Sequence, residues 1–450
     1  MSSLKRFLRT WFQRVVRSVA FLPLPMLIGG ILLGIGMFYL EAYTGLSLWL
    51  REEVPSLTIG SVDTARSTLG LLTGAIITLT VFTFTQIMGL FSQVAGSYSP
   101  RLLPLLTGDR ALQFVLGAYL GAIVFNVIVL LGIDTTSGGK LPALSILVCA
   151  VVDVACLVLF VYFIATISRK IQVSKIIDFV YARSVDAFDR AEEAEHFAVS
   201  ATLPEFSTWF SVPSPRDGYL GTVDFHRLSE LASEYNTRFY LGLPKGHYVP
   251  KYQPLLESER ELSKEEVHEV LAAVSPIRER YEDWHLPPVR LLAEIAVRAM
   301  SPGINDPGTA IDALDKLTSS LARLMHLPQY NVYRAPEQGT VYLRTHSFAE
   351  VIRALMQELR NCCAADTLVS RKLLQMLYHL KMIAAKNGPY PDILDREIQA
   401  LIADNRRLIE NDYDRESLAE DVARLRQRKH LVVEELDYLL DAKQEVAGYR

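Results

Sequence analysis

Four long runs of apolar residues occupy the first third of the chain. They lie between Arg17 and Glu41, over Ser67–Pro100, over Ala111–Ile133 and over Leu141–Ser168, and Asp153 is the only charge inside the last three. Each run is long enough to cross about 30 Å of hydrocarbon as an α-helix. Core helices of soluble proteins seldom sustain such runs four times in succession. The pattern therefore predicts an α-helical membrane protein with a four-helix transmembrane domain over residues 21–168.

The remainder of the chain has a different character. Over Ser18–Ser168 only 12 of 151 residues are charged, whereas 79 of 282 are charged over Arg169–Arg450. Such a difference in charge content is expected if the first part lies in lipid and the second part in water. Apolar residues continue at helical spacing beyond Ser168, so we predict that residues 169–200 extend the fourth membrane helix and that 201–450 form a cytoplasmic α+β domain.

Positive charges flank the four runs unevenly. One set of helix ends carries Lys5, Arg6, Arg9, Arg14, Arg17, Arg101, Arg110, Arg169, Lys170 and Lys175, whereas the other carries only Arg51, Arg66 and Lys140. Because cytoplasmic flanks of membrane helices are rich in Lys and Arg, the basic N-terminus (residues 1–20) and the C-terminus are both predicted to be cytoplasmic.

Glycines recur at four-residue spacing in the first three runs, as Gly30 and Gly34, Gly70 and Gly74, and Gly117 and Gly121. This spacing lets helix backbones approach closely in lipid. It predicts tight packing, either within one chain or between copies.

Polar residues in the second run are candidates for lining an ion pathway: Thr73, Thr78, Thr80, Thr83 and Gln86. They could wet a cavity or pore. Threonine hydroxyls can equally bond back to carbonyl groups of their own helix, which requires no function. Both interpretations stay open.

Asp153 is the most informative residue in the membrane part, because an ionisable side chain at mid-bilayer is costly and marks a functional site by default. From helix rise we place it level with Thr80, and we place Asn126 of the third run about 8 Å nearer the outer side. Asp153 either clamps two helices through hydrogen bonds or binds a cation or relays protons. A bundle of four helices is thin for burying these polar groups, so we predict a homo-oligomer.

The second domain reads as a small β unit followed by helices. Short strands are predicted near 218–224, 237–243 and 247–249, with a short helix at 228–235 and a hairpin over 331–344. Helices are predicted at 264–282, 287–300, 308–326, 347–364, 367–386, 391–410 and 415–443.

A conspicuous helix–turn–helix motif spans Ala299–Ala310. Pro302 and Gly303 end the first helix, and Asn305 or Asp306 can cap the second. The start of a helix can also hold a small anionic or polar ligand. Besides the capping interpretation, we therefore consider a ligand or subunit-contact site at Ser301, Gly303, Asn305 and Asp306.

At this motif the chain resembles a known family. The segment Leu291–Ala310, with Ser-Pro-Gly-Ile-Asn-Asp-Pro at 301–307, is similar to the signature of a family of bacterial predicted membrane proteins, domain of unknown function 2254. Weaker similarities lie at Ser99–Arg101, Gly218–Asp224 and Pro244–Val249. The resemblance implies a multi-pass protein of the bacterial inner membrane and implies no activity.

Several classes of function find no support in the sequence. A net charge of −4 gives no basic field for nucleic acid. The four cysteines and nine histidines show no metal-ligand spacing, so we expect neither a metal nor another cofactor. No Walker loop, zinc-protease, hydrolase or kinase signature is present, so an enzyme is not predicted.

Two functions remain as hypotheses. The first is a homo-oligomeric ion channel or transporter whose cytoplasmic domain regulates it, suggested by the polar second helix and Asp153. The alternative is a membrane-anchored sensor or scaffold whose cytoplasmic domain binds a small ligand or a protein partner at the Ser301–Pro307 turn. The expected partners are the lipid bilayer, other copies of the chain, and an ion or small molecule.

Overall fold

The chain forms two compact units, Met1–Lys175 and Ile176–Arg450. The computed structural model describes residues 21–44, 46–53, 59, 61–103, 109–135, 142–170, 172–192, 196–200, 202–221, 223–274, 276, 286–327, 330–336, 338–387 and 390–427. The basic N-terminal segment and the last part of the final predicted helix lie outside these residues.

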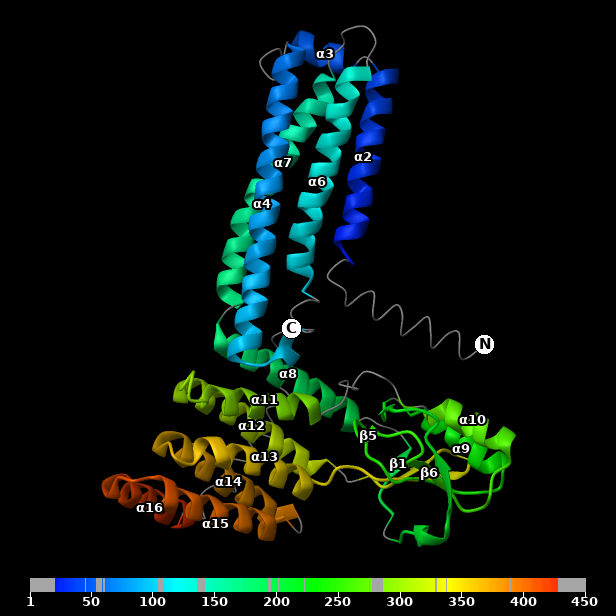
Figure 1. Cartoon of the computed structure of the whole chain (residues 1–450), viewed down its shortest axis with the longest axis vertical. Coiled ribbons are helices and arrows are strands. Elements are labelled where there is room, and N and C mark those ends of the chain that lie inside the picture. Colours follow the sequence, from blue (N-terminus) through cyan, green and yellow to red (C-terminus); the bar gives the residue numbers. More distant parts are fainter. Residues whose placement is uncertain are drawn as a thin grey trace. The chain divides into compact units, whose positions relative to one another are not determined.

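The first unit is a bundle of long apolar helices (Figure 1). They are α2 (Pro23–Tyr43), α4 (Val62–Ser97), α6 (Arg110–Thr135) and α7 (Ala143–Lys170), and each is long and apolar enough to cross a membrane. The short helix α3 (Leu46–Glu53) follows α2 at one end of the bundle, called the α3 end below. The prediction of four helices long and apolar enough to span a membrane is confirmed.

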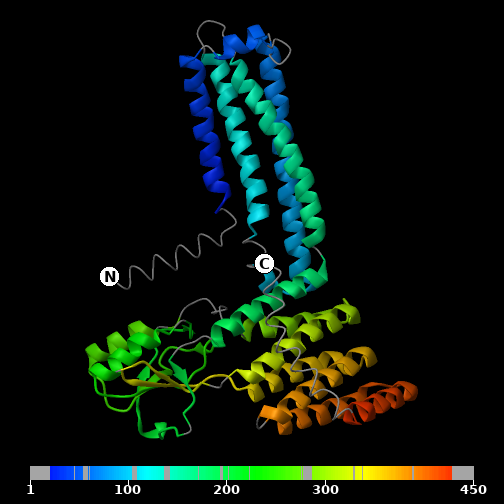
Figure 2. The ribbon, with the colours of Figure 1, turned by 180° about the vertical axis from the view of Figure 1, so that it is seen from behind.

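Helix α6 is the centre of this bundle, because it packs on α2, on α4 and on α7 (Figures 1 and 2). Glycines let α2 and α6 meet backbone to backbone. A Cβ atom on Gly30 would press on the carbonyl group of Gly121, and a Cβ on Gly121 would lie 2.9 Å from the carbonyl oxygen of Met26. Two helix backbones can approach this closely only where the residue has no side chain.

The glycine pair of α4 behaves differently. A Cβ on Gly70 or Gly74 of α4 would meet nothing within 4 Å in this chain. Close packing by glycine is therefore an internal property of α2 and α6, and the α4 pair lies on the outer surface of the single bundle.

The second unit begins within α8 (Val173–Glu192), which is amphipathic and packs on α12 (Pro307–His326). Ser184 and Ser320 lie 3.0 Å apart at the centre of that contact, and Arg323 donates to Asp189 at 2.6 Å. The predicted uninterrupted extension of the fourth membrane helix is not observed, since α7 ends at Lys170 and α8 starts separately at Val173. Helix α7 is apolar on all sides, which suits lipid, whereas α8 has one apolar face, which suits a helix packed on the surface of a water-soluble unit.

Six helices of this unit stack in layers (Figures 1 and 2). Besides α12, they are α11 (Leu286–Ala299), α13 (Phe348–Cys363), α14 (Thr367–Asn387), α15 (Pro391–Leu408) and α16 (Asp412–Gln427). The start of α13 shows how sequence sets these boundaries. Ser347 and Glu350 each bond to the other's backbone N–H, which satisfies two amides that the first turn leaves free.

The β unit is larger than predicted. Its main sheet has the order β1-β7-β8-β4-β6-β2, in which β4 (Phe239–Leu241) and β8 (Thr340–Leu343) are parallel and the other neighbours antiparallel. The predicted hairpin is present as β7 (Val332–Arg334) and β8. The remaining elements are β1 (Phe197–Ala198), β2 (Phe210–Pro213), β6 (Pro254–Ser258), α9 (Phe225–Glu234) and α10 (Lys264–Val274), with the pair β3 (Gly218–Tyr219) and β5 (Tyr248–Val249).

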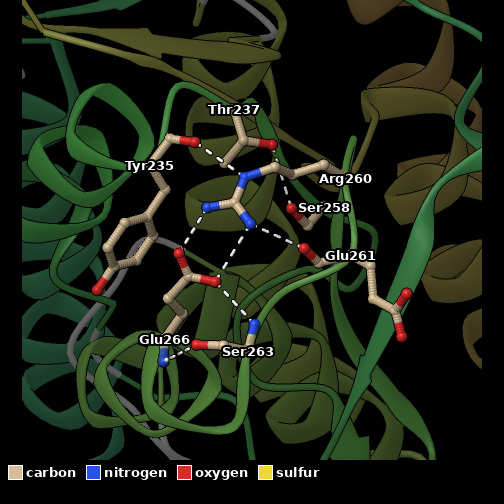
Figure 3. Close-up of polar contacts among 7 residues, drawn as sticks. All are labelled: Tyr235, Thr237, Ser258, Arg260, Glu261, Ser263 and Glu266. Carbon is tan, nitrogen blue, oxygen red and sulfur yellow. Dashed lines mark hydrogen bonds and ion pairs between the residues drawn. The ribbon is translucent and has the colours of Figure 1, made fainter.

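Arg260 fixes the turn from β6 into α10 (Figure 3). Its guanidinium donates to the carbonyl oxygens of Tyr235 and Glu261 at 2.9 and 2.8 Å, and to both carboxylate oxygens of Glu266. Glu266 also accepts from the backbone of Ser263 at 2.7 Å, as in a capping box. Arg260 lowers the pKa of Glu266 to about 2. These bonds tie the end of β6 and the end of α9 to the first turn of α10, and so explain part of the fold.

Candidate functional site

Asp153 and Asn126 form a hydrogen-bonded pair inside the membrane unit. The amide nitrogen of Asn126 on α6 donates to both carboxylate oxygens of Asp153 on α7, at 3.0 and 3.1 Å. Asn126 is 0% and Asp153 2% exposed. A carboxyl group is thus held between two helices, shielded from the surface of the bundle, with a single amide as its hydrogen-bonding partner among the described residues.

This pairing corrects the predicted depths. Asn126 is level with Asp153, not 8 Å nearer the outer side. Helix α6 ends at Thr135 and α7 starts at Ala143, each two residues later than the ends assumed from sequence. Because each residue adds about 1.5 Å of rise, these errors shift the two side chains toward a common level.

The threonines of α4 do not share one role. Thr73, Thr78 and Thr80 donate to carbonyl oxygens four residues earlier in their own helix, at 2.7 to 2.8 Å, as the structural interpretation expected. Thr78 and Gln86 are exposed on the single chain. Thr83, in contrast, is completely buried, and its hydroxyl has no hydrogen-bond partner among the described residues. A pore-lining role for these residues stays a prediction.

Two further polar residues of the same bundle were not predicted. Glu41 of α2 accepts from the backbone N–H and the hydroxyl of Ser145 on α7, at 2.6 and 2.8 Å. Tyr119 of α6 is 0% exposed and lies beside Thr83. Glu41 was read only as the end of an apolar run. A single tyrosine in such a run resembles ordinary core, so periodicity alone gave no signal for Tyr119.

In the second unit, the turn at Ser301–Pro307 caps a helix as the sequence suggested. Asp306 accepts from the backbone N–H of Thr309 at 3.1 Å and from its hydroxyl at 2.5 Å, with Pro307 as the first residue of α12. The Thr309 bonds lower the pKa of Asp306. Asn305 adopts φ of 46°, a left-handed conformation that asparagine tolerates.

A surface groove of about 480 Å³ lies beside this turn. Helix α11, the turn after it and the end of α13 form the groove, whose lining residues are Glu294, Val297, Arg298, Met300, Ser301, Pro302, Asn361 and Cys362. Ser301 contributes to it, whereas Gly303, Asn305 and Asp306 do not line it. The four residues predicted as one site are therefore divided between a groove and a helix cap.

Comparisons with known proteins agree with the architecture. Uncharacterized proteins of Mycobacterium bovis and Mycobacterium tuberculosis are each 26% identical over 342 residues, which is 71% of this chain and 64% of each relative. The chain thus spans less than two thirds of the length of these relatives. No solved structure matches it significantly. Residues 16–379 match the family described as predicted membrane protein, DUF2254, and the chain belongs to that family.

Proposed function

We propose that the protein is a membrane transport protein that moves a small cation, with the Asn126–Asp153 pair as its ion-binding centre. One observation carries the proposal, namely a carboxyl group buried between α6 and α7 with a single amide donor for both oxygens. Mid-membrane carboxyl groups are costly, and in transport proteins they mark ion and proton pathways. A purely structural clamp could use two neutral amides at lower cost.

The geometry favours a carrier over a permanently open pore. Asp153 is 2% exposed, and a hydrophobic cluster that includes Leu69, Phe125 and Ile146 lies in the same bundle. An ion that reached Asp153 would require the helices to move apart first. Access from one side at a time is the property that distinguishes carriers from channels.

The setting of this carrier is also part of the proposal. The relatives are bacterial, and the distribution of Lys and Arg favours an inner-membrane protein with both termini in the cytoplasm. Several copies would associate along α4. The outer surface of this helix carries the exposed polar residues Thr78 and Gln86. It also carries Gly70 and Gly74, which meet nothing in their own chain. The second unit would then regulate transport.

Flux measurements test the central step. The full chain is reconstituted in liposomes, and proton, Na⁺ and K⁺ fluxes are measured under imposed gradients. Asp153→Asn should reduce flux at least about a hundredfold, because an amide cannot bind and release a cation or proton. Tyr162→Phe on the exposed face of α7 serves as the control and should retain most of the flux. Absence of flux in the wild type, or full flux in Asp153→Asn, would contradict the proposal.

A second candidate rests on the groove beside Ser301. Its volume of about 480 Å³ lies within the usual range for sites that bind small molecules. Exposed Asn361 and Cys362 stand next to apolar Val297 and Met300 there. A sensor or scaffold would use this groove for a ligand or a partner segment. The flux assay separates the candidates, because a sensor would leave every imposed gradient unchanged.

A further inference from the structure

One face of α7 carries a stripe of polar and thiol side chains through the interior of the bundle. Ser145, Cys149, Asp153 and Cys156 are spaced by four, four and three residues, which places them on the same side of a helix. All four are buried, with at most 3% exposed. The stripe extends about 16 Å along the helix axis. It was not recognised from sequence because serine and cysteine are common inside apolar helices.

The stripe reaches a second carboxyl group at the α3 end of the bundle. Glu41 accepts both hydrogen bonds from Ser145. Cys149 lies within electrostatic reach of Glu41 and of Asp153. Along α7, Ser145 and Asp153 are about 12 Å apart. A partly buried carboxyl group, Glu41, therefore stands at the end of the polar stripe, and a fully buried one, Asp153, in its middle.

On the other side of Asp153 the stripe continues into a group of buried hydroxyls. Cys156 lies within electrostatic reach of Asp153 and of Tyr119, and Tyr119 lies beside Thr83 of α4. Tyr119 and Asn126 are seven residues apart on α6, about 10 Å along the same face. The interface of α4, α6 and α7 thus holds polar groups on both sides of the Asn126–Asp153 pair.

Asn126 Oδ1 has no hydrogen-bond partner among the described residues, and the hydroxyls of Thr83 and Tyr119 lie beside each other without a hydrogen bond of ordinary length. Thr83 contrasts with its neighbours on α4, since Thr80 and Thr85 bond back to their own helix. Buried polar atoms nearly always have partners, and where the protein supplies none an ordered water usually does. Asn126 Oδ1, on the side chain that bonds Asp153, and the two hydroxyls farther along the interface are therefore positions where internal water would complete the hydrogen bonding.

The chemistry of Asp153 favours a proton over a metal ion. Mg²⁺ and Ca²⁺ take six or more oxygen ligands. Asn126 turns its N–H₂ group, not its oxygen, toward Asp153, and the stripe adds thiols on either side. Among the described residues no group of three His, Cys, Asp or Glu side chains could hold a metal ion. A proton needs only groups that both donate and accept hydrogen bonds.

We propose that the species carried through this bundle is the proton, exchanged between Asp153 and Glu41 at the α3 end and between Asp153 and the opposite side through water held by Tyr119 and Thr83. The inference rests on the proposed function and names its substrate. Each water, hydroxyl or thiol that accepts a proton releases another, so only O–H and S–H bonds form and break. The net result is the movement of one proton down its gradient, without a co-reactant.

Conservative variants of the full chain in liposomes test this relay, with a pH-sensitive dye as the readout. Tyr119→Phe and Thr83→Val should each slow proton flux about tenfold, because each removes one hydroxyl that holds the bridging water. The matched controls are Tyr162→Phe on α7 and Thr85→Val on α4, whose side chains are exposed, and the Thr85 hydroxyl bonds only back to its own helix. Both controls should keep the wild-type rate, and the wild type should carry neither Na⁺ nor K⁺.

The outcomes separate this inference from the proposed function. If flux of Na⁺ or K⁺ depends on Asp153 and no proton flux is seen, the proton is not the transported species. The proposal that the protein is a cation carrier would then still hold. An absence of flux of every ion would overturn both. Equal rates for Tyr119→Phe and Tyr162→Phe would overturn the water relay while Asp153 kept its role. Melting temperatures of all variants in detergent are compared with the wild type, so that a loss of flux is assigned to the relay only where folding is intact.

Discussion

Gly30→Ala is expected to destabilise the membrane unit by about 1–3 kcal/mol, although alanine is the better helix former. The new Cβ would press on the carbonyl group of Gly121, with the Gly121 Cα at 2.9 Å. Backbone atoms cannot rotate away as a side chain can, so α2 would have to separate from α6. Thermal unfolding in detergent, followed by size-exclusion chromatography, measures the effect.

Gly29→Ala, next to Gly30 on the same helix, is the matched control, because a Cβ there meets nothing within 4 Å. It should melt at or slightly above the wild-type temperature. Equal melting temperatures for the two variants would show that α2 does not pack on α6 through these glycines.

Arg360→Met is expected to destabilise the second unit by about 3 kcal/mol at neutral pH. Arg360 of α13 pairs with Glu397 of α15, which is 6% exposed, and with Asp404 at 3.2 Å. Without Arg360, a buried carboxylate loses its main compensating charge. The double variant Arg360→Met/Glu397→Leu should recover most of the stability, since an apolar pair can replace a buried ion pair.

The effect of Arg360→Met should depend on pH. Burial raises the pKa of Glu397, and Arg360 and Arg353 oppose that rise. Removal of Arg360 therefore raises this pKa further in the folded state, while the unfolded value stays ordinary. The folded variant then takes up a proton more readily, and its deficit should shrink as the pH falls from neutral toward about 5. Melting curves at both pH values test this, and a deficit that grows in acid would contradict it.

Much of the fold was predictable because its signals are local. The four apolar runs identified the membrane helices, and Ser347 with Glu350 and Asp306 with Pro307 marked where two helices begin. The hairpin of β7 and β8 likewise follows from neighbouring residues. Strands β2 and β6 were missed, since their pairing joins Phe210 with Ser258 across a long stretch of chain. Such pairing depends on tertiary contacts that periodicity does not record.

The candidate site was predictable only in part, for reasons of geometry. The cost of a charge in lipid identified Asp153. Its partner Asn126 was named but placed at the wrong depth, because small errors in helix ends add up along two antiparallel helices. Thr83 differs from the other threonines only in what surrounds it. Tyr119 and Glu41 were not recognised as candidates from sequence. In the structure, Tyr119 lies beside Thr83, and Glu41 accepts a hydrogen bond from Ser145.

The central claim is that Asp153 exchanges a proton during transport, and infrared difference spectroscopy of the reconstituted full chain tests it most directly. When the bath pH is switched between about 5 and about 9, a range that brackets ordinary transport conditions, the C=O stretch of a protonated carboxyl group should appear and disappear. The part of this band that Asp153 contributes should be lost in Asp153→Asn and shifted in Asn126→Ala, whose side chain no longer bonds the carboxyl group. An identical difference spectrum for the wild type and Asp153→Asn would show that Asp153 is a static part of the fold, and would contradict the account.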